Sequence, residues 1–271
     1  MLPAKFGMIG GGIMGEALIS RLIAQEIYLP QNILVSEPQA QRRELLARQY
    51  GVQVTDKNPL AAGAAEVLLL AIKPQIFKQV ADELSEFAIP VAEKPLVISI
   101  LAGTSLGALE KAFPTQPVIR AMPNTPATVG AGMTAIAAGK GVQPEHLDWA
   151  RRIFTAVGEV VEIPESLMDA VTGLSGSGPG YVAMAIDALT DGGVAAGLPR
   201  TIAAKLALQT VWGTAQLLRE SGLHPAELKD RVTSPGGTTI AGLAQLEQAG
   251  FRSALIEAVR AACRRSQELG Q

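Results

Sequence analysis

The feature that most constrains how this chain can fold is a glycine motif in residues 5–15 (KFGMIGGGIMG). Its first residues are mostly apolar and suit a short buried strand, and the residues after the motif repeat apolar side chains at helical spacing. Gly10, Gly12 and Gly15 therefore form G-x-G-x-x-G between a strand and a helix. This order predicts the first strand, turn and helix of a nucleotide-binding α/β unit.

The three glycines have separate physical roles in such a turn. The first permits a tight turn, the second lets the backbone approach a pyrophosphate, and the third lets the helix pack close to its strand. The helix N-terminus then presents free amide N–H groups to the anion. We therefore expect a dinucleotide to bind at Gly10, Gly12 and Gly15.

Composition and charge narrow the class of protein. The 271 residues are enough for one large or two ordinary domains, and 23 Lys and Arg against 25 Asp and Glu give a net charge of -2. No basic run is interleaved with aromatic residues, so nucleic acid is not expected as a partner. The one cysteine, Cys263, excludes an internal disulfide and fits a reducing compartment. The first strand begins almost at once, without the stretches of a signal peptide, and we expect a cytoplasmic protein.

Neither a membrane segment nor a metal site is expected. The longest apolar stretch, Tyr181–Leu198, is interrupted by Asp187 and Asp191, so it suits a buried helix better than a membrane span. The two histidines, His146 and His224, are far apart and lack neighbours at metal-ligand spacing.

A carboxylate follows the second expected strand, residues 32–36 (NILVS). Glu37 lies about 20 positions beyond the glycines, where an acidic residue can hydrogen-bond the ribose hydroxyls and would repel a 2′-phosphate. The alternative is a helix-capping or solvated carboxylate before Pro38. Arg42 and Arg43 follow a turn later and could receive a phosphate instead. The residues alone therefore leave NAD and NADP open as the cofactor.

Strands and helices alternate through the rest of the first half. Further strands are expected at residues 52–54, 66–72, 96–100, 118–121, 133–137 and 159–163, with a helix at 145–157. This alternation is typical of a doubly wound, Rossmann-type α/β domain, which we place at residues 1–164.

Two loops at strand ends are candidates for a binding site. Ligands in such sheets bind beyond the carboxyl ends of the strands, so we expect residues 71–74 (AIKP) to lie beside the cofactor. The alternative for Lys73 is an ordinary solvated loop residue. Residues 122–126 (MPNTP) contain two prolines that make the backbone stiff. This second loop either lines a pocket or only turns the chain into the next strand.

The second half has a different pattern. After Ser166 no convincing strand occurs, and helical patterns cover residues 181–196, 201–221, 226–232, 239–248 and 252–269. So much apolar surface on a short helical half is expected to pack against a second copy of the chain. We place this all-α domain at residues 165–271.

Two polar, glycine-rich segments interrupt these helices. Residues 172–180 (TGLSGSGPG) permit a tight turn into a helix that begins near Pro179. Residues 233–239 (TSPGGTT) bring backbone N–H groups and two hydroxyls to the next helix N-terminus, which suits a substrate carboxylate. Taken alone, each segment is more often an ordinary helix cap than a site.

Several motifs, taken in order, resemble those of pyrroline-5-carboxylate reductase. They are residues 171–179 (VTGLSGSGP), 191–199 (DGGVAAGLP) and 228–243 (LKDRVTSPGGTTIAGL), behind the glycine loop. With AIKP and MPNTP, the similarity covers nearly the whole chain. The resemblance implies reduction of the ring imine of pyrroline-5-carboxylate to L-proline by NADPH or NADH. It also implies a homodimer interlocked through the helical halves, often built into a larger ring.

The resemblance also assigns site residues. Its cofactor contacts fall on Gly10, Gly12, Ile13, Met14, Gly15, Ser36, Glu37, Asn58, Ala71, Ile72, Lys73, Pro74, Leu101 and Ala102. Its substrate contacts fall on Glu165, Gly237, Thr238 and Thr239, and the catalytic candidates are Glu165 and Thr239. One departure concerns Glu37, because family members that prefer NADPH tend to have a small or basic residue there.

The implied chemistry requires little from the protein. Hydride passes from the nicotinamide ring to the imine carbon, and the imine nitrogen must be protonated or strongly hydrogen-bonded. A hydroxyl has a pKa far from 7, so Thr239 suits polarisation and orientation better than proton donation.

Two other functions fit parts of the pattern. A two-domain β-hydroxyacid dehydrogenase would have a lysine on the long first helix of the second half, but residues 181–196 contain none. A non-catalytic nucleotide sensor would keep the glycine loop without needing residues 233–239.

Overall fold

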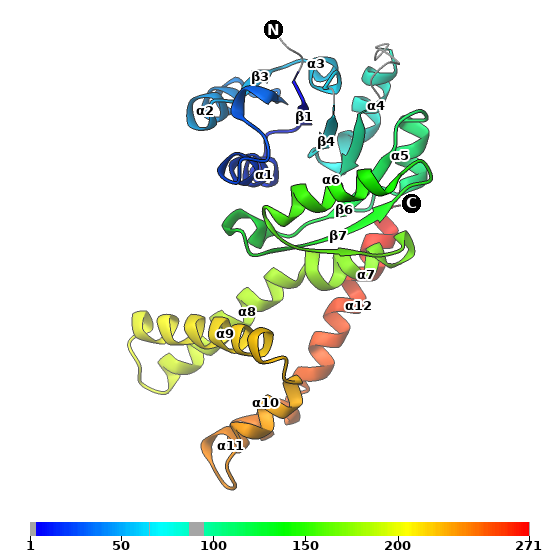
Figure 1. The fold of residues 1–271 in the computed structure, drawn as a ribbon. Coiled ribbons are helices and arrows are strands. Elements are labelled where there is room, and N and C mark those ends of the chain that lie inside the picture. Colours follow the sequence, from blue (N-terminus) through cyan, green and yellow to red (C-terminus); the bar gives the residue numbers. More distant parts are fainter. Residues whose placement is uncertain (1–3, 65, 87–94, 271) are drawn as a thin grey trace. The chain divides into compact units, whose positions relative to one another are not determined.

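The structure is a computed structural model that describes residues 4–64, 66–86 and 95–270 (Figure 1). The chain divides into two compact units, one formed by Met1–Gly176 together with Ala261–Gln271 and the other by Ser177–Arg260. The first unit contains a sheet with helices, and the second is helical. The predicted succession of an α/β half and a helical half is therefore confirmed.

The first unit is built around a sheet in which the described residues form eight strands, in the order β3-β2-β1-β4-β5-β6-β7-β8. The strands are β1 (Phe6–Ile9), β2 (Ile33–Ser36), β3 (Gln53–Thr55), β4 (Val67–Leu70), β5 (Leu96–Ser99), β6 (Val118–Met122), β7 (Gly132–Ala138) and β8 (Gly158–Glu162). The helices of this unit are α1 (Ile13–Ala24), α2 (Ala40–Tyr50), α3 (Asn58–Ala62), α4 (Phe77–Ser85), α5 (Leu106–Ala112), α6 (Pro144–Thr155) and α7 (Met168–Val171).

The central strands are apolar because both faces of the sheet are covered. β1, β4 and β5 are buried at every position. Alternate residues of β4 belong to different hydrophobic clusters, with Val67 and Leu69 in one and Leu68 and Leu70 in the other. Since successive side chains of a strand point to opposite faces, helices cover both sides of the sheet. This arrangement is the predicted doubly wound α/β fold.

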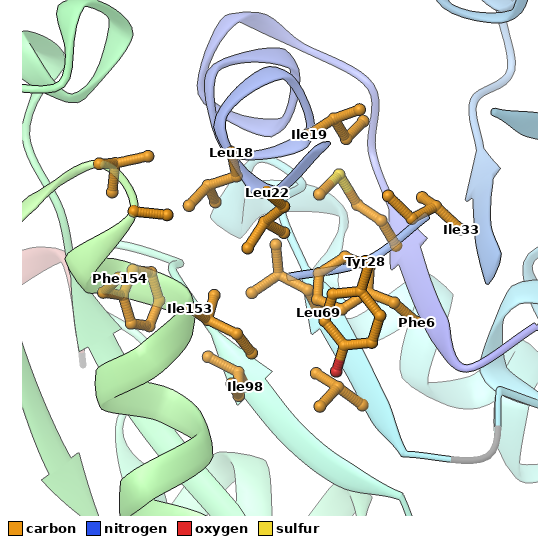
Figure 2. Packing of buried hydrophobic residues seen from close by; sticks show 14 of the residues in the cluster. Phe6, Leu18, Ile19, Leu22, Tyr28, Ile33, Leu69, Ile98, Ile153 and Phe154 are labelled. Carbon is orange, nitrogen blue, oxygen red and sulfur yellow. The ribbon is translucent and has the colours of Figure 1, made fainter. Parts of the chain in front are cut away.

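The two clusters hold different helices against the sheet. The first contains Leu22 from α1 and Phe154 from α6, together with Phe6 of β1 (Figure 2). The second contains Leu84 from α4 and Leu109 from α5. Burying each large apolar side chain stabilises the fold by about 1.5–3 kcal/mol. The sheet edge that carries the binding loops is therefore set on a rigid base.

Two strands, β7 and β8, run in the direction opposite to the other six. β7 pairs antiparallel with β6, with Met122 opposite Ala135, and β8 runs parallel to β7. The connection from Met122 to Gly132 contains only a 3₁₀ turn, Thr125–Val129. A connection this short cannot carry the crossover that a parallel neighbour needs. The proline-rich loop thus serves as a return between adjacent strands.

Of the expectation for residues 172–180, the helix start near Pro179 is confirmed, because a helix begins at Gly178, but the tight turn expected before it is wrong. Thr172–Gly176 form a π-helix that follows α7 directly. The Thr172 hydroxyl donates to the Met168 carbonyl at 2.9 Å, and the Ser175 hydroxyl donates to the Val171 carbonyl at 3.2 Å. Because these hydroxyls bond to carbonyl groups where the helix widens, the chain stays helical instead of turning.

The second unit consists of helices joined by short glycine- and proline-containing turns. α8 and α9 approach closely, since a Cβ added at Gly193 would lie 3.0 Å from the Cβ of Ala203. Arg200 and Asp191 form an ion pair of 2.8 Å across the turn between them. The helices are α8 (Gly178–Ala195), α9 (Arg200–Ser221), α10 (Pro225–Arg231), α11 (Thr238–Gln248) and the first part of α12 (Phe251–Leu269).

The helices of the second unit bury few of their own side chains. α8 buries Thr190, and α9 buries Ala203 and Ala207. In contrast, Met184 is 77% exposed and Trp212 is 61% exposed. Exposed apolar surface on this scale marks an interaction site.

The end of α12 returns to the first unit. There Ser266, which is 4% exposed, donates a hydrogen bond of 2.7 Å to the Asp169 carboxylate. A Cβ added at Gly270 would lie 2.7 Å from the carbonyl oxygen of Gly103, in the loop after β5. Leu269 and Gly270 are therefore packed against the loop that follows β5.

The described parts of the chain have neither a helix suited to a membrane nor a cluster suited to a metal ion. None of their helices is long and apolar enough to cross a bilayer. Residues 4–64, 66–86 and 95–270 contain no group of three or more histidine, cysteine, aspartate or glutamate side chains that could bind a metal ion. Cys263 is a free thiol.

Candidate active site

Loops that carry predicted cofactor residues leave neighbouring strands at one edge of the sheet. Ile9 is in register with Ser36 of β2 on one side and with Leu70 of β4 on the other. The N–H of Gly10 donates to the Ser36 carbonyl at 2.8 Å, and the N–H of Ala71 donates to the Ile9 carbonyl at 2.8 Å. Because the strand order reverses direction at β1, this is the switch point at which doubly wound sheets bind ligands.

The glycine loop has the geometry that a close turn requires. Gly10 has a φ of 100°, and a Cβ added there would lie 2.5 Å from the carbonyl oxygen of Ala71. A Cβ added at Gly15 would lie 2.6 Å from the carbonyl oxygen of Gly10. Neither position has room for a side chain, and the first has a backbone conformation that favours glycine.

Gly12 differs from its two neighbours in the motif because the space beside it is open. A Cβ added there would meet no heavy atom of the described residues within 4 Å. Gly12 is the N-cap of α1 and has no side chain with which to cap that helix, so the first N–H groups stay available to an anion. Ile13 is 76% exposed, and Met14 packs against the first cluster. These features fit the pyrophosphate of a dinucleotide.

Glu37 is held against the glycine loop. It is only 7% exposed, which excludes a freely solvated carboxylate. Its Oε2 accepts the N–H of Gly11 at 3.0 Å, and its Oε1 accepts the N–H of Gln39 at 3.0 Å. Arg43 donates to the carbonyls of Glu37 at 2.7 Å and Pro38 at 2.8 Å. The carboxylate therefore has a fixed position beside the loop.

Two other predicted cofactor residues contact each other directly. The Ser36 hydroxyl donates to Oδ1 of Asn58 at 2.7 Å. Asn58 in turn donates from Nδ2 to the Glu83 carboxylate at 2.7 Å. Ser36 is 1% exposed, whereas Asn58 is half-buried. The buried serine thus orients the more accessible amide.

Arg42 reaches from α2 back to the glycine loop. Its Nε donates to the carbonyl of Gly11 at 2.6 Å, and its guanidinium forms an ion pair with Glu16. The Tyr50 hydroxyl donates to the other oxygen of Glu16 at 2.8 Å. Sequence reasoning considered this arginine only as a phosphate ligand. The acceptors that it contacts come from elements distant in the sequence, so no local pattern indicates them.

This cluster changes the pKa values of two of its members. Burial raises the pKa of the Glu16 carboxyl, but the hydrogen bonds from Arg42 and Tyr50 and the Arg42 charge outweigh burial and lower it below its ordinary value. Burial, together with the hydrogen bond to Glu16 and the Glu16 charge, raises the pKa of Tyr50 to about 12.

The remaining predicted cofactor residues differ in how far their side chains are exposed to solvent. Ile72 is half-buried, and Lys73 and Pro74 are exposed beyond β4. Leu101 is 1% exposed and belongs to the second cluster, so only its backbone can meet a ligand. Ala102, which follows it, is half-buried.

Glu165, a predicted substrate residue, lies in the first unit. Its Oε1 accepts the N–H of Leu106 at the start of α5, and the Arg120 guanidinium lies 3.3 Å from the same oxygen. Arg120 is 6% exposed. Sequence reasoning missed this arginine, although a single cation in the apolar strand Val118–Met122 is a signal that it has a partner.

Asn124 joins two of the motifs singled out in the sequence. Its Oδ1 accepts the N–H of Met133 at 2.8 Å, and its Nδ2 donates to the Ser175 carbonyl at 3.0 Å. The asparagine thus ties the proline-rich loop to β7 and to the π-helix. The two prolines on either side of it indicate a fixed loop but not these contacts.

The predicted substrate residues Gly237, Thr238 and Thr239 lie in the second unit, at the start of α11. Gly236 has a φ of 65°, and the N–H of Gly237 donates to the Ser234 carbonyl at 3.0 Å. Gly237 is the N-cap and has no side chain to cap the helix, so the N–H groups of the first turn can bind a carboxylate. Thr239 is half-buried.

Two family models match this chain, one in each half. The model described as "Pyrroline-5-carboxylate reductase dimerisation" matches residues 165–269. The model described as "NADP oxidoreductase coenzyme F420-dependent" matches residues 5–103.

Known proteins resemble the chain over its whole length. A pyrroline-5-carboxylate reductase of Synechocystis sp. is 62% identical over 100% of both chains. The solved structure of a pyrroline-5-carboxylate reductase from Coxiella burnetii is 35% identical, covers 99% of each chain and has a TM-score of 0.91. The structure of Plasmodium falciparum pyrroline carboxylate reductase with NADP bound is 32% identical, covers 100% of each chain and has a TM-score of 0.88.

Proposed function

This chain belongs to the pyrroline-5-carboxylate reductase family, and we infer that it reduces the ring imine of L-1-pyrroline-5-carboxylate to L-proline. The observation that carries this conclusion is that identity extends over the full length, through both the glycine loop and the segment before α11. One imine, one reduced nicotinamide cofactor and one proton give one proline and one oxidised cofactor. The enzyme thus completes proline synthesis.

The first unit would hold NADPH or NADH. The open space at Gly12 and the uncapped start of α1 suit the pyrophosphate, and we assign Glu37 and Asn58 to the ribose. The loops after β4 and β5 would complete this site with Ile72, Lys73 and the backbone of Leu101. When bound, the reduced cofactor supplies the hydride.

The start of α11 would hold the substrate. We assign the substrate carboxylate to the N–H groups of the first turn at Gly237 and Thr238, because a helix N-terminus favours an anion. We assign the Thr239 hydroxyl to the imine nitrogen, which it would hydrogen-bond and orient. Glu165 uses Oε1 for its contacts with Leu106 and Arg120, and we assign its Oε2 to the substrate.

The helical half would also join copies of the chain into an oligomer. Its exposed apolar side chains and its match to a dimerisation family support a homodimer, which we propose is built into a larger ring. We keep residues 1–164 as the cofactor part and residues 165–271 as the substrate and dimerisation part. The free thiol of Cys263 supports a reducing compartment, and we place the enzyme in the cytoplasm.

One assay tests the activity directly. Purified protein is mixed with racemic pyrroline-5-carboxylate and either NADH or NADPH, and the loss of coenzyme absorbance is followed. We expect one L-proline, identified by chiral chromatography, for each coenzyme oxidised, and no oxidation without the imine. If neither coenzyme is oxidised, the proposed function is wrong.

A further inference from the structure

The charges beside the glycine loop decide which coenzyme the site prefers. Glu37 is the charged residue that bears most directly on coenzyme preference, because an acidic side chain after the second strand lies where the ribose of a dinucleotide binds. Both of its oxygens already accept backbone N–H groups, from Gly11 and from Gln39. Rotating the carboxylate away would break both bonds and leave the buried N–H of Gly11 unpaired, which is costly. The negative charge therefore cannot move aside for a 2′-phosphate.

The neighbouring cations have acceptors of their own. Arg42 is matched by the Glu16 carboxylate and also bonds to the Gly11 carbonyl. Arg43 bonds to the carbonyls of Glu37 and Pro38. A 2′-phosphate would have to compete with these acceptors for either guanidinium. Among the described residues, no lysine or arginine side chain forms an ion pair with the Glu37 carboxylate, whose oxygens accept backbone N–H groups.

Gly11 is held from both sides by the same segment. Glu37 accepts its N–H, and Arg42 donates to its carbonyl. A Cβ added at Gly11 would lie 2.6 Å from Cδ1 of Leu46 on α2, so the loop is pressed closely onto that helix. The carboxylate and the glycine loop consequently form one rigid group.

We propose that the carboxylate of Glu37, locked onto the glycine loop, makes this enzyme prefer NADH to NADPH, while Arg42 positions the loop for both coenzymes. The proposal rests on the proposed function, because it concerns the coenzyme of that reaction. Glu37 is the residue that selects the coenzyme by its charge. Arg42 is a positioning residue that acts through Gly11.

Direct binding of each coenzyme tests the selection. Calorimetric titration of the wild-type protein with NADH and NADPH should show NADH bound on the order of tenfold more tightly, the size expected for one close charge near a protein surface. Glu37→Gln keeps the side-chain shape and removes the charge, so this ratio should fall to about one. Glu44→Gln removes an exposed charge from α2, the helix that follows Glu37, and should leave the ratio unchanged.

The positioning role is tested with the charge held constant. The double variant Glu16→Gln with Arg42→Met removes one negative and one positive charge together. It should weaken both coenzymes by a similar factor and leave their ratio as in the wild type. A change in the ratio would show that Arg42 takes part in selection.

The dependence of the two coenzyme affinities on ionic strength is a second, independent test of the proposal. If Glu37 repels the 2′-phosphate, added salt screens that repulsion and narrows the preference for NADH. Tighter binding of NADPH by the wild type, weakened further by salt, would mean that the arginines hold the phosphate and would overturn the proposal. Binding of neither coenzyme would instead count against the proposed function.

Discussion

The carboxylate of Glu165 lies 3.3 Å from the guanidinium of Arg120, which is buried in β6. The same oxygen accepts the N–H of Leu106, so one side chain joins the segment after β8 to β6 and to the start of α5. This contact places a predicted substrate residue in a structural network of the first unit.

Removal of this carboxylate should destabilise the protein. Glu165→Ala leaves the buried Arg120 charge without its partner, which should lower the free energy of unfolding by about 1–3 kcal/mol. Urea denaturation of the wild type and the variant measures this loss. Asp82→Ala, which breaks an exposed pair with Lys78, is the control and should cost less than about 0.5 kcal/mol. Equal losses in the two variants would show that the pair of Glu165 with Arg120 stabilises the protein no more than an exposed ion pair does.

The glycines of the loop should respond differently to alanine. Gly10→Ala places a Cβ 2.5 Å from the Ala71 carbonyl oxygen in a left-handed conformation, so the free energy of unfolding should fall by about 2 kcal/mol or more. Gly12→Ala has free space and should change it by less than about 0.5 kcal/mol. The second variant should instead bind coenzyme at least about tenfold more weakly, since its methyl group occupies the pyrophosphate approach. Thermal unfolding and coenzyme titration separate the two effects; strong coenzyme binding by Gly12→Ala would place the pyrophosphate elsewhere.

The role of Thr239 can be read from turnover. Thr239→Val keeps the shape and deletes the hydroxyl, so a buried imine nitrogen loses one hydrogen bond, about 1–3 kcal/mol or roughly 5- to 150-fold in kcat. The loss should grow as pH rises from 6, because the substrate then brings its own proton less often. Thr201→Val, at the matching position of α9, is the control and should leave kcat unchanged. A loss of several thousandfold at every pH would make Thr239 the essential acid.

The Glu16 and Tyr50 contact predicts how stability depends on pH. The folded pKa of Tyr50 is raised to about 12 from 10.0, so between these values the unfolded state loses the proton first and stability falls as pH rises. Tyr50→Phe should remove that part of the fall. For Glu16 the lowered pKa has the opposite sign, so its contribution is present above pH 4.5 and disappears as the solution is acidified through the folded pKa. Urea midpoints of wild type and Tyr50→Phe from pH 9 to pH 11 check the first slope, and those of wild type and Glu16→Gln from pH 6 down to pH 3 check the second. Identical slopes of wild type and Tyr50→Phe above pH 10 would mean that the pKa of Tyr50 is not raised in solution.

The exposed apolar helices predict an assembly. The protein should sediment well above the 28.3 kDa of one chain. Trp212→Glu puts a charge on a side chain that is 61% exposed in one chain and should shift the protein toward smaller species, with loss of activity. Gln41→Glu, at an exposed position of α2 in the first unit, is the control and should leave the assembly unchanged. A monomeric wild type at working concentration would contradict the dimer.

Much of the fold follows from local pattern. Val67–Leu70 is apolar at every position, which is typical of a strand covered on both faces, and the structure buries all four residues. The glycine spacing places Gly10 between two strand ends, where its positive φ is needed. The helix over Arg200–Ser221 follows from a proline-free segment with apolar side chains at helical spacing, bounded by Pro199 and Gly222. These features depend only on neighbouring residues, so the sequence by itself determined them.

Tertiary structure decided what the functional side chains contact. Gly11 and Glu37 are 26 positions apart, and Leu106 and Glu165 are 59 apart, so no sequence window contains either pair. The direction of β7 and the π-helix after α7 likewise depend on which hydrogen-bond partners the folded chain supplies. In the first unit, sequence pattern indicates which apolar residues are buried, because strand and helix spacing places them on the covered faces. Which polar groups meet is decided only when the sheet brings distant strand ends to one edge.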